Sequence, residues 1–166
     1  YPVESLSIQI LDDSTDDTTE IVKKLVSSYK EKDLNIECYH RSNRAGNKAG
    51  ALAEGLLHVK GEFIAIFDAD FVPRPDYLKS TIPYFCSYKV GMVQTRWGHL
   101  NALNNPLTRA QAIALDGHLV VEQAARSRNC LLFNFNGSSG VWRKECIISS
   151  GGWQTDTIAE DLDLSY

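Results

Sequence analysis

The sequence lacks any apolar run of the ~18 residues that a membrane-crossing helix needs, and no signal peptide opens it. Its lysines and arginines never stand more than two in succession, and its formal net charge is −4, which argues against nucleic acid as the main partner. Repeats, low-complexity tracts and linkers are also absent. The 166 residues, with 43% hydrophobic and 23% charged side chains, predict one soluble globular domain with its own core.

The chain also lacks the spaced cysteine and histidine pairs that hold zinc. Its cysteines are far apart and form no Cys-x-x-Cys pair, and its histidines show no ligand spacing. We therefore expect buried thiols in a reducing compartment rather than a disulfide framework or a zinc site. The cysteines are Cys38, Cys86, Cys130 and Cys146.

Both ends of the sequence are abrupt. It begins at Tyr1, almost directly on a strand pattern, and stops at Tyr166 inside a helical pattern. We expect an excerpt of a longer protein, so the lack of a membrane segment describes this excerpt only.

Strand and helix patterns alternate along the chain. Short apolar runs predict strands over 6–11, 35–39, 62–67, 90–95 and 130–135. Helical patterns occupy the segments between them, and the last, over 108–128, is expected to turn Ile113, Val120 and Ala124 inward. This alternation predicts an α/β fold whose mostly parallel central sheet is flanked by helices.

Asp68 and Asp70 stand at the end of the apolar run 62–67, separated only by Ala69. In open α/β sheets, ligands bind at the carboxyl ends of the strands. Two carboxylates so close together can share a hard divalent cation and leave positions open for substrate oxygens. Asp is also common where a strand meets a turn, so the pair alone leaves a metal site and a plain turn equally open.

Two more acidic clusters and a lysine fall at the ends of predicted elements. Asp12 and Asp13 follow the first strand, and Glu160 and Asp161 follow a Gly-Gly-Trp turn. Lys48 stands between two glycines just before a helix, which suits contact with phosphate oxygens, although the P-loop pattern is absent. Taken singly, each cluster also fits turn or cap chemistry, and the lysine fits a surface loop. Because strand ends converge at one sheet edge, we expect all of them around one crevice.

Five segments resemble, in order, the motifs of processive family 2 glycosyltransferases, with the closest likeness to cellulose-synthase-like and β-mannan-synthase-like membrane enzymes. The segments are Leu11–Thr18, Asn47–Leu52, Phe67–Asp70, Phe135–Ser138 and Ala159–Ser165. The resemblance implies a GT-A (Rossmann-like) fold, truncated at both ends. It also implies inverting, metal-dependent transfer of a hexose from a UDP- or GDP-sugar to a glycan or lipid-linked acceptor.

The resemblance also implies roles for the matching donor-side residues. Asp12 and Asp13 would lie near the base and ribose of the nucleotide, and Asp68 would face the nucleotide as well. Lys48 would contact the diphosphate. Asp70 would bind Mg²⁺ or Mn²⁺.

On the acceptor side, the resemblance makes Asp161 the general base that deprotonates the acceptor hydroxyl. Asn136, Gly137 and Ser138 would line the acceptor end of the site, with Glu160 beside the base. Trp153, which follows two glycines just before the base motif, is the tryptophan expected to contact sugar.

Gln94-Thr-Arg-Trp97 is similar to the family's Gln-x-x-Arg-Trp motif but is one residue too short and follows an earlier strand. We therefore assign Trp97 to core or subsite packing and give His99 a structural role.

The family's first strand would precede Tyr1, and its true Gln-x-x-Arg-Trp motif would follow Tyr166. We expect residues 1–95 to form the nucleotide-sugar half of a single catalytic domain and residues 96–166 the acceptor half.

The implied parent protein is embedded in the plasma (inner) membrane with this domain on the cytoplasmic face. Two alternatives stay open at this point. One is a nucleotidyltransferase that makes activated sugars, although such enzymes carry a glycine-rich basic loop where this chain has Asp12 and Asp13. The other is a domain that binds a nucleotide sugar without turnover.

Overall fold

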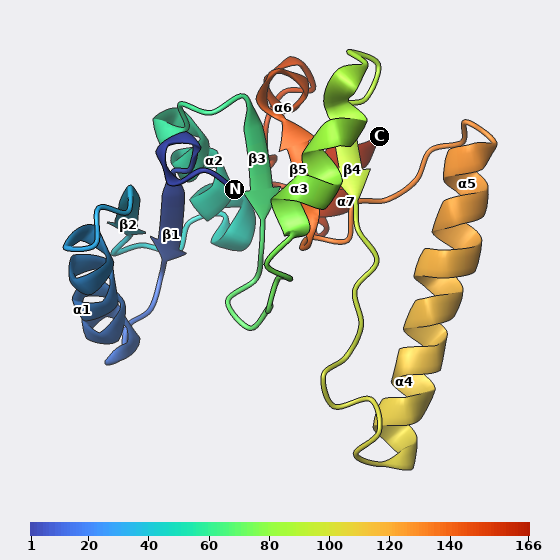
Figure 1. Cartoon of the computed structure of the whole chain (residues 1–166), viewed down its shortest axis with the longest axis horizontal. Helices are drawn as coiled ribbons and strands as arrows, with labels where there is room; N and C mark the ends of the chain where they lie inside the picture. Colours follow the sequence, from blue (N-terminus) through green and yellow to red (C-terminus); the bar gives the residue numbers. More distant parts are fainter.

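Two small sheets form the centre of the fold. In the computed structural model, which describes residues 1–166, β1 (Ile8–Asp12) pairs in parallel with β2 (Ile36–His40). In the second sheet, β5 (Gly140–Arg143) lies between β3 (Phe63–Ile66) and β4 (Met92–Gln94) and is antiparallel to both. Figure 1 shows β1 and β2 on one side of the molecule, with β3, β5 and β4 next to them.

Helices connect and cover these strands. They are α1 (Thr18–Lys30), α2 (Asn47–His58), α3 (Tyr77–Thr81), α4 (Pro106–Asp116), α5 (Ala124–Arg128), α6 (Lys144–Ser149) and α7 (Glu160–Ser165). Two 3-10 helices, η1 (Val3–Ser5) and η2 (Ile82–Cys86), and a π-helical stretch, η3 (Gly117–Gln123), complete the chain. None of the helices combines the length and the apolar character that a bilayer span requires.

The predicted α/β class and the parallel pairing of the first two strands are confirmed, but the second sheet differs from the prediction. Residues 130–135 form no strand, because Leu131 and Leu132 are exposed and the backbone of Asn134 bonds to the Gln123 side chain. The strand instead comes later, at β5. All four of its residues are buried and pair with β3, and Gly140, Val141 and Trp142 also pair with β4. Both pairings are antiparallel, so the sheet is less parallel than expected.

The predicted helix over 108–128 exists as one continuous rod made of α4, η3 and α5 (Figure 1). Its start is well defined, because Asn105 accepts a 3.0 Å hydrogen bond from the backbone of Thr108. The expected inward face is wrong, since Ile113 and Val120 are exposed while Leu119 is buried. The π-helical turns of η3 shift the helical phase, which a regular 3.6-residue period does not anticipate.

The main core lies between the second sheet and helices α2, α6 and α7. Its buried members are Ala49, Ile66, Phe135, Trp142, Ile147, Trp153 and Leu164. Trp142 contacts both Phe135 and Trp153 edge-on, at centroid distances of 5.6 and 6.4 Å. This corrects the expectation for Trp153. Only 7% of it is exposed, so its ring packs in the core instead of facing a sugar.

The expectation of buried cysteines also needs correction. Cys86 and Cys130 are exposed, and Cys38 and Cys146 are partly buried; all four are free thiols. Burial raises the pKa of the Cys38 thiol.

Replacing Ile147 with Ala should lower the free energy of unfolding by about 2–5 kcal/mol, because it leaves a cavity at a fully buried position. Ile148, its neighbour, is 57% exposed, and Ile148→Ala should cost ~0.5 kcal/mol or less. Urea unfolding of the two variants provides the comparison. Equal losses would contradict this description of the core.

Candidate functional site

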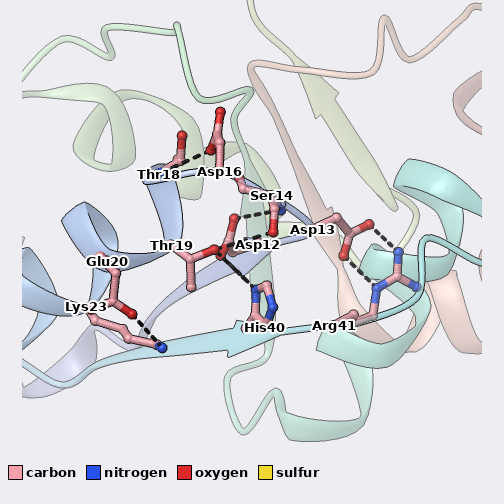
Figure 2. Close-up of polar contacts among 10 residues, drawn as sticks. All are labelled: Asp12, Asp13, Ser14, Asp16, Thr18, Thr19, Glu20, Lys23, His40 and Arg41. Atoms are coloured by element: carbon pink, nitrogen blue, oxygen red, sulfur yellow. Dashed lines mark hydrogen bonds and ion pairs between the residues drawn. The ribbon is translucent and has the colours of Figure 1, made fainter.

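Asp12, the last residue of β1, holds three hydrogen bonds while only 5% exposed. Its carboxylate accepts from the backbone of Ser14 at 3.0 Å, the hydroxyl of Thr19 at 2.8 Å and Nδ1 of His40 at 2.9 Å (Figure 2). Burial raises the pKa of Asp12, but these hydrogen bonds outweigh it and lower the pKa well below its usual range. Asp12 is therefore an ionised carboxylate, and it links the ends of β1 and β2 to the start of α1.

Asp13 is held by Arg41, which the sequence did not single out. The guanidinium donates from Nε at 2.8 Å and from Nη2 to the two carboxylate oxygens (Figure 2), and these bonds lower the pKa of Asp13. Arg41 also donates to the carbonyls of Ala45 at 3.1 Å and Asn47 at 2.9 Å. This side chain thus fixes the β1 edge to the loop that carries Lys48. In the sequence, only the position of Arg41 directly after β2 could have indicated that it belongs to the site.

Lys48 lies in the first turn of α2, whose N-cap is Gly46. Gly46 has φ +69°, and a methyl group on it would lie 2.5 Å from Cγ2 of Thr155, so only glycine fits. The Lys48 ammonium donates to Oδ1 of Asp68 at 2.5 Å and to the carbonyl of Gly137 at 2.8 Å. An ammonium has three N–H donors, so one remains for a further ligand.

Asp68 and Asp70 lie in the turn after β3, as predicted. The backbone N–H of Asp68 donates to Oγ of Ser138 at 2.9 Å, which fixes the turn to the loop before β5. Asp70 is exposed and takes part in none of the ion pairs of the structure.

These acids do not form a complete protein cage for a metal ion. No group of three or more acidic, histidine or cysteine side chains could hold one. Mg²⁺ typically needs only one or two carboxylates when phosphate oxygens and water complete its shell. The free carboxylate of Asp70, beside Asp68, fits that partial role.

Gly137 marks the point where Lys48 and Asp161 meet. It has φ +71°, and a methyl group placed on it would lie 3.0 Å from Oδ2 of Asp161 and 3.4 Å from Nζ of Lys48. Asp161 lies in the first turn of α7, where its Oδ1 accepts from the backbone of Leu162 at 2.9 Å. The other carboxylate oxygen, Oδ2, therefore faces the site.

Side chains from two distant segments support the loop 136–138. The backbone of Asn136 donates to Oε1 of Gln94 at 2.9 Å. The Asn136 side chain lies 3.3 Å from Nε2 of His118, whose Nδ1 in turn lies 3.1 Å from Glu122. His118 and Glu122 belong to the π-helical stretch η3, a type of turn that is frequent at functional sites. From the sequence, His118 was considered only as one of the histidines whose spacing does not fit a metal site.

The structure thus brings together five predicted site residues at one place. They are Lys48, Asp68, Gly137, Ser138 and Asp161. Asp12 and Asp13 join this cluster only indirectly, because Arg41 links Asp13 to the loop before Lys48. Asp70, Asn136 and Glu160 flank it in the chain, and Trp153 is separated from it in the core.

Comparisons with known proteins show the family of this chain. The family described as "Glycosyl transferase family 2" matches residues 7–150. "Probable glucomannan 4-beta-mannosyltransferase 6" of Oryza sativa subsp. japonica is 45% identical to this chain, covering 99% of it and 30% of the relative. "Glucomannan 4-beta-mannosyltransferase 7" of Arabidopsis thaliana is 44% identical, covering 99% of this chain and 31% of the relative. The chain therefore spans about a third of the length of these curated relatives.

Solved structures of other proteins also superpose on this chain. The mannosyltransferase PcManGT from Pyrobaculum calidifontis, in complex with GDP-Man and Mn²⁺, superposes with a TM-score of 0.73 at 25% identity, covering 97% of this chain and 42% of that one. S. aureus TarS in complex with UDP-GlcNAc gives a TM-score of 0.67 at 17% identity, covering 99% and 44%. At that identity the TarS likeness concerns the fold alone.

Replacing Asp12 with Asn should lower the free energy of unfolding near neutral pH by about 1–3 kcal/mol, because three donors lose their charged acceptor. A carboxylate with a lowered pKa stabilises the fold above its unfolded pKa of ~4, and this contribution is lost as the pH falls below that value. The wild-type protein should therefore lose stability below about pH 4, and the variant should lose less.

Urea unfolding between neutral and acidic pH measures both effects. Asp156→Asn, at an exposed position, is the matched control and should follow the wild-type curve. An Asp12→Asn curve that parallels the wild type through the acid range would contradict the role given to Asp12.

Proposed function

This chain belongs to glycosyl transferase family 2 and has the predicted GT-A fold, and from this premise we propose that it is the donor-binding and catalytic part of an inverting mannosyltransferase. The proposed donor is GDP-mannose, and the proposed acceptor is a growing polysaccharide of the glucomannan class. Relatives named glucomannan 4-beta-mannosyltransferases and a mannosyltransferase solved with GDP-Man and Mn²⁺ support both choices.

The observation that carries the proposal is the meeting of Lys48 and Asp161 at Gly137. An inverting sugar transfer needs a cation where the diphosphate leaves and a base where the acceptor hydroxyl attacks. The two groups come from helices that lie far apart in the chain, α2 and α7. Their closeness is what this chemistry requires.

The donor's diphosphate would lie against Lys48. The third N–H of the ammonium is free for a phosphate oxygen, while Asp68 and the Gly137 carbonyl hold the other two in place. Asp70, with Asp68 beside it, would hold Mg²⁺ or Mn²⁺, which when bound would neutralise charge on the departing diphosphate. Asp12 and Asp13 stay predicted neighbours of the base and ribose, although Arg41 already occupies the carboxylate of Asp13.

Asp161 would act as the general base. Its Oδ2 would take the proton of the acceptor hydroxyl as that oxygen bonds to the anomeric carbon. The bond from the anomeric carbon to the diphosphate would break at the same time, and its electron pair would leave with the phosphate oxygen. The loop 136–138, supported by Gln94 and His118, would set the distance between these reacting groups.

The larger setting remains a prediction. We propose that residues 1–95 contribute mainly to the nucleotide side and residues 96–166 to the acceptor side of one catalytic domain. A position on the cytoplasmic face of a membrane is likewise proposed from the family resemblance alone.

Calorimetric titration of GDP, with and without Mn²⁺, tests the donor site. We expect Mn²⁺ to strengthen GDP binding, Asp70→Asn to abolish that gain, and Lys48→Ala to weaken binding about 10- to 100-fold through loss of charged hydrogen bonds. Lys60→Ala, at an exposed lysine outside the site, should bind like the wild type. Metal-independent binding, or no binding at all, would count against the proposal.

Asp161→Asn tests the catalytic base separately. We expect GDP-mannose affinity to be kept while mannosyl transfer, measured as GDP release, falls by about 10²- to 10⁴-fold. Retained binding without turnover in the variant also separates a chemical role from a folding defect. A variant that transfers sugar at the wild-type rate would refute the assignment.

A further inference from the structure

The chain that leaves β4 carries aromatic side chains to the same edge of the sheet as the acidic turn. Thr95 continues the pairing of β4 with the segment before β5, since its backbone donates to the carbonyl of Ser139 at 3.0 Å. Arg96 is anchored on the other side, through a 2.8 Å ion pair with Asp116 of α4. Trp97 and His99 follow directly after these two anchored residues.

These two residues extend a row of rings that starts at the acidic turn. Phe67, directly before Asp68, stacks on Phe71 at a centroid distance of 5.3 Å. Phe71 meets the edge of Trp97 at 6.3 Å, and Trp97 lies 5.9 Å from His99. We name Phe71, Trp97 and His99 the aromatic wall. Its first member, Phe71, directly follows Asp70 in the chain.

Two ring nitrogens in the aromatic wall have no hydrogen-bond partner. Nε1 of Trp97 and Nδ1 of His99 are both buried and form no hydrogen bond. Buried polar groups in folded proteins are nearly always paired, because an unpaired one is costly. Because protein atoms cover both nitrogens, a ligand oxygen pairs with them only if the segment 97–99 shifts on binding, and that pairing would then add to ordinary contact.

We propose that the aromatic wall is a subsite for a pyranose unit of the acceptor glycan. A pyranose presents apolar C–H groups, which pack on aromatic rings, and hydroxyl oxygens, which accept from N–H donors. Trp97 and His99 supply both properties within one short segment. This inference rests on the proposed function and specifies the acceptor side of that site.

The position of the aromatic wall favours the acceptor over the donor. Asp12 and Asp13, the predicted nucleotide neighbours, lie where β1 ends, whereas Trp97 and His99 of the wall follow β4, at the far side of β5 from β3. Figure 1 shows β1 and β4 on opposite sides of β3. A sugar at the wall would therefore approach from the side away from the nucleotide.

The experiment titrates a β-1,4-linked mannohexaose into the chain and follows tryptophan fluorescence together with calorimetry. Trp142 and Trp153 are buried in the core, so a change of emission on binding would report Trp97. Trp97→Phe keeps an aromatic ring but removes the N–H, and we expect about three- to tenfold weaker binding. His99→Phe should weaken binding similarly, whereas His99→Asn, which keeps a side-chain N–H donor, should bind more tightly than His99→Phe.

Trp142→Phe is the matched control. It removes another unpartnered indole N–H, but from the core, and should leave oligosaccharide affinity unchanged. Urea unfolding of each variant separates loss of binding from loss of folding. If the wall is only a packing cluster, Trp97→Phe binds the hexaose as tightly as the wild type, or the wild type binds none. Either result overturns the inference.

The proposed function and the subsite can fail independently. GDP and Mn²⁺ binding should be the same in Trp97→Phe and the wild type. Trp97-dependent hexaose binding without any GDP binding would refute the donor site and keep the subsite. Normal GDP binding without hexaose binding would do the reverse.

Discussion

The candidate site depends on the position of one ammonium group. Nζ of Lys48 joins the turn after β3, through Asp68, to the loop before β5, through the carbonyl of Gly137. Asp68 and Asp161 lie near it, and their like charges would otherwise repel one another at close range. The lysine itself is fixed from behind, because Arg41 joins its loop to Asp13 at the end of β1. Hydrogen bonds from Arg41 and Lys48 thus connect the first sheet to the second across this edge.

The antiparallel direction of β5 explains why the loop 136–138 reaches this edge. The carboxyl ends of β3 and β4 lead into the acidic turn and the aromatic wall. Because β5 runs opposite to both, the loop that precedes it lies at the same edge. Its attachment is tight, since Ser139 donates from its backbone to the carbonyl of Ile66 at 2.8 Å and accepts from Thr95. The loop is therefore an extension of the sheet, and donor, base and acceptor groups can be held at fixed distances from it.

Much of the site could be predicted because its residues lie in short motifs with their own chemistry. Paired acids after a strand suit a divalent cation, and a lysine at a helix start suits a phosphate, in any α/β fold. The supporting residues could not be found in this way. Arg41 and His118 act on partners about 28 and 18 positions distant, and an isolated arginine or histidine in the sequence does not indicate such a partner. The expectation for Trp153 was wrong because a position near the base motif in the chain does not decide whether the ring faces the site or the core.

The sequence by itself determined the α/β class, the parallel first pair of strands and which residues are candidates for the site, because local apolar periods and compact motifs specify these. Only the tertiary structure decided the direction of β5, the phase of the long helix after its π-helical turns, and which acids are already paired. It also decided that Lys48 and Asp161 meet at Gly137, that Trp153 packs in the core, and that the indole N–H of Trp97 has no hydrogen-bond partner. These are outcomes of packing and long-range hydrogen bonding, which join residues that no local pattern connects.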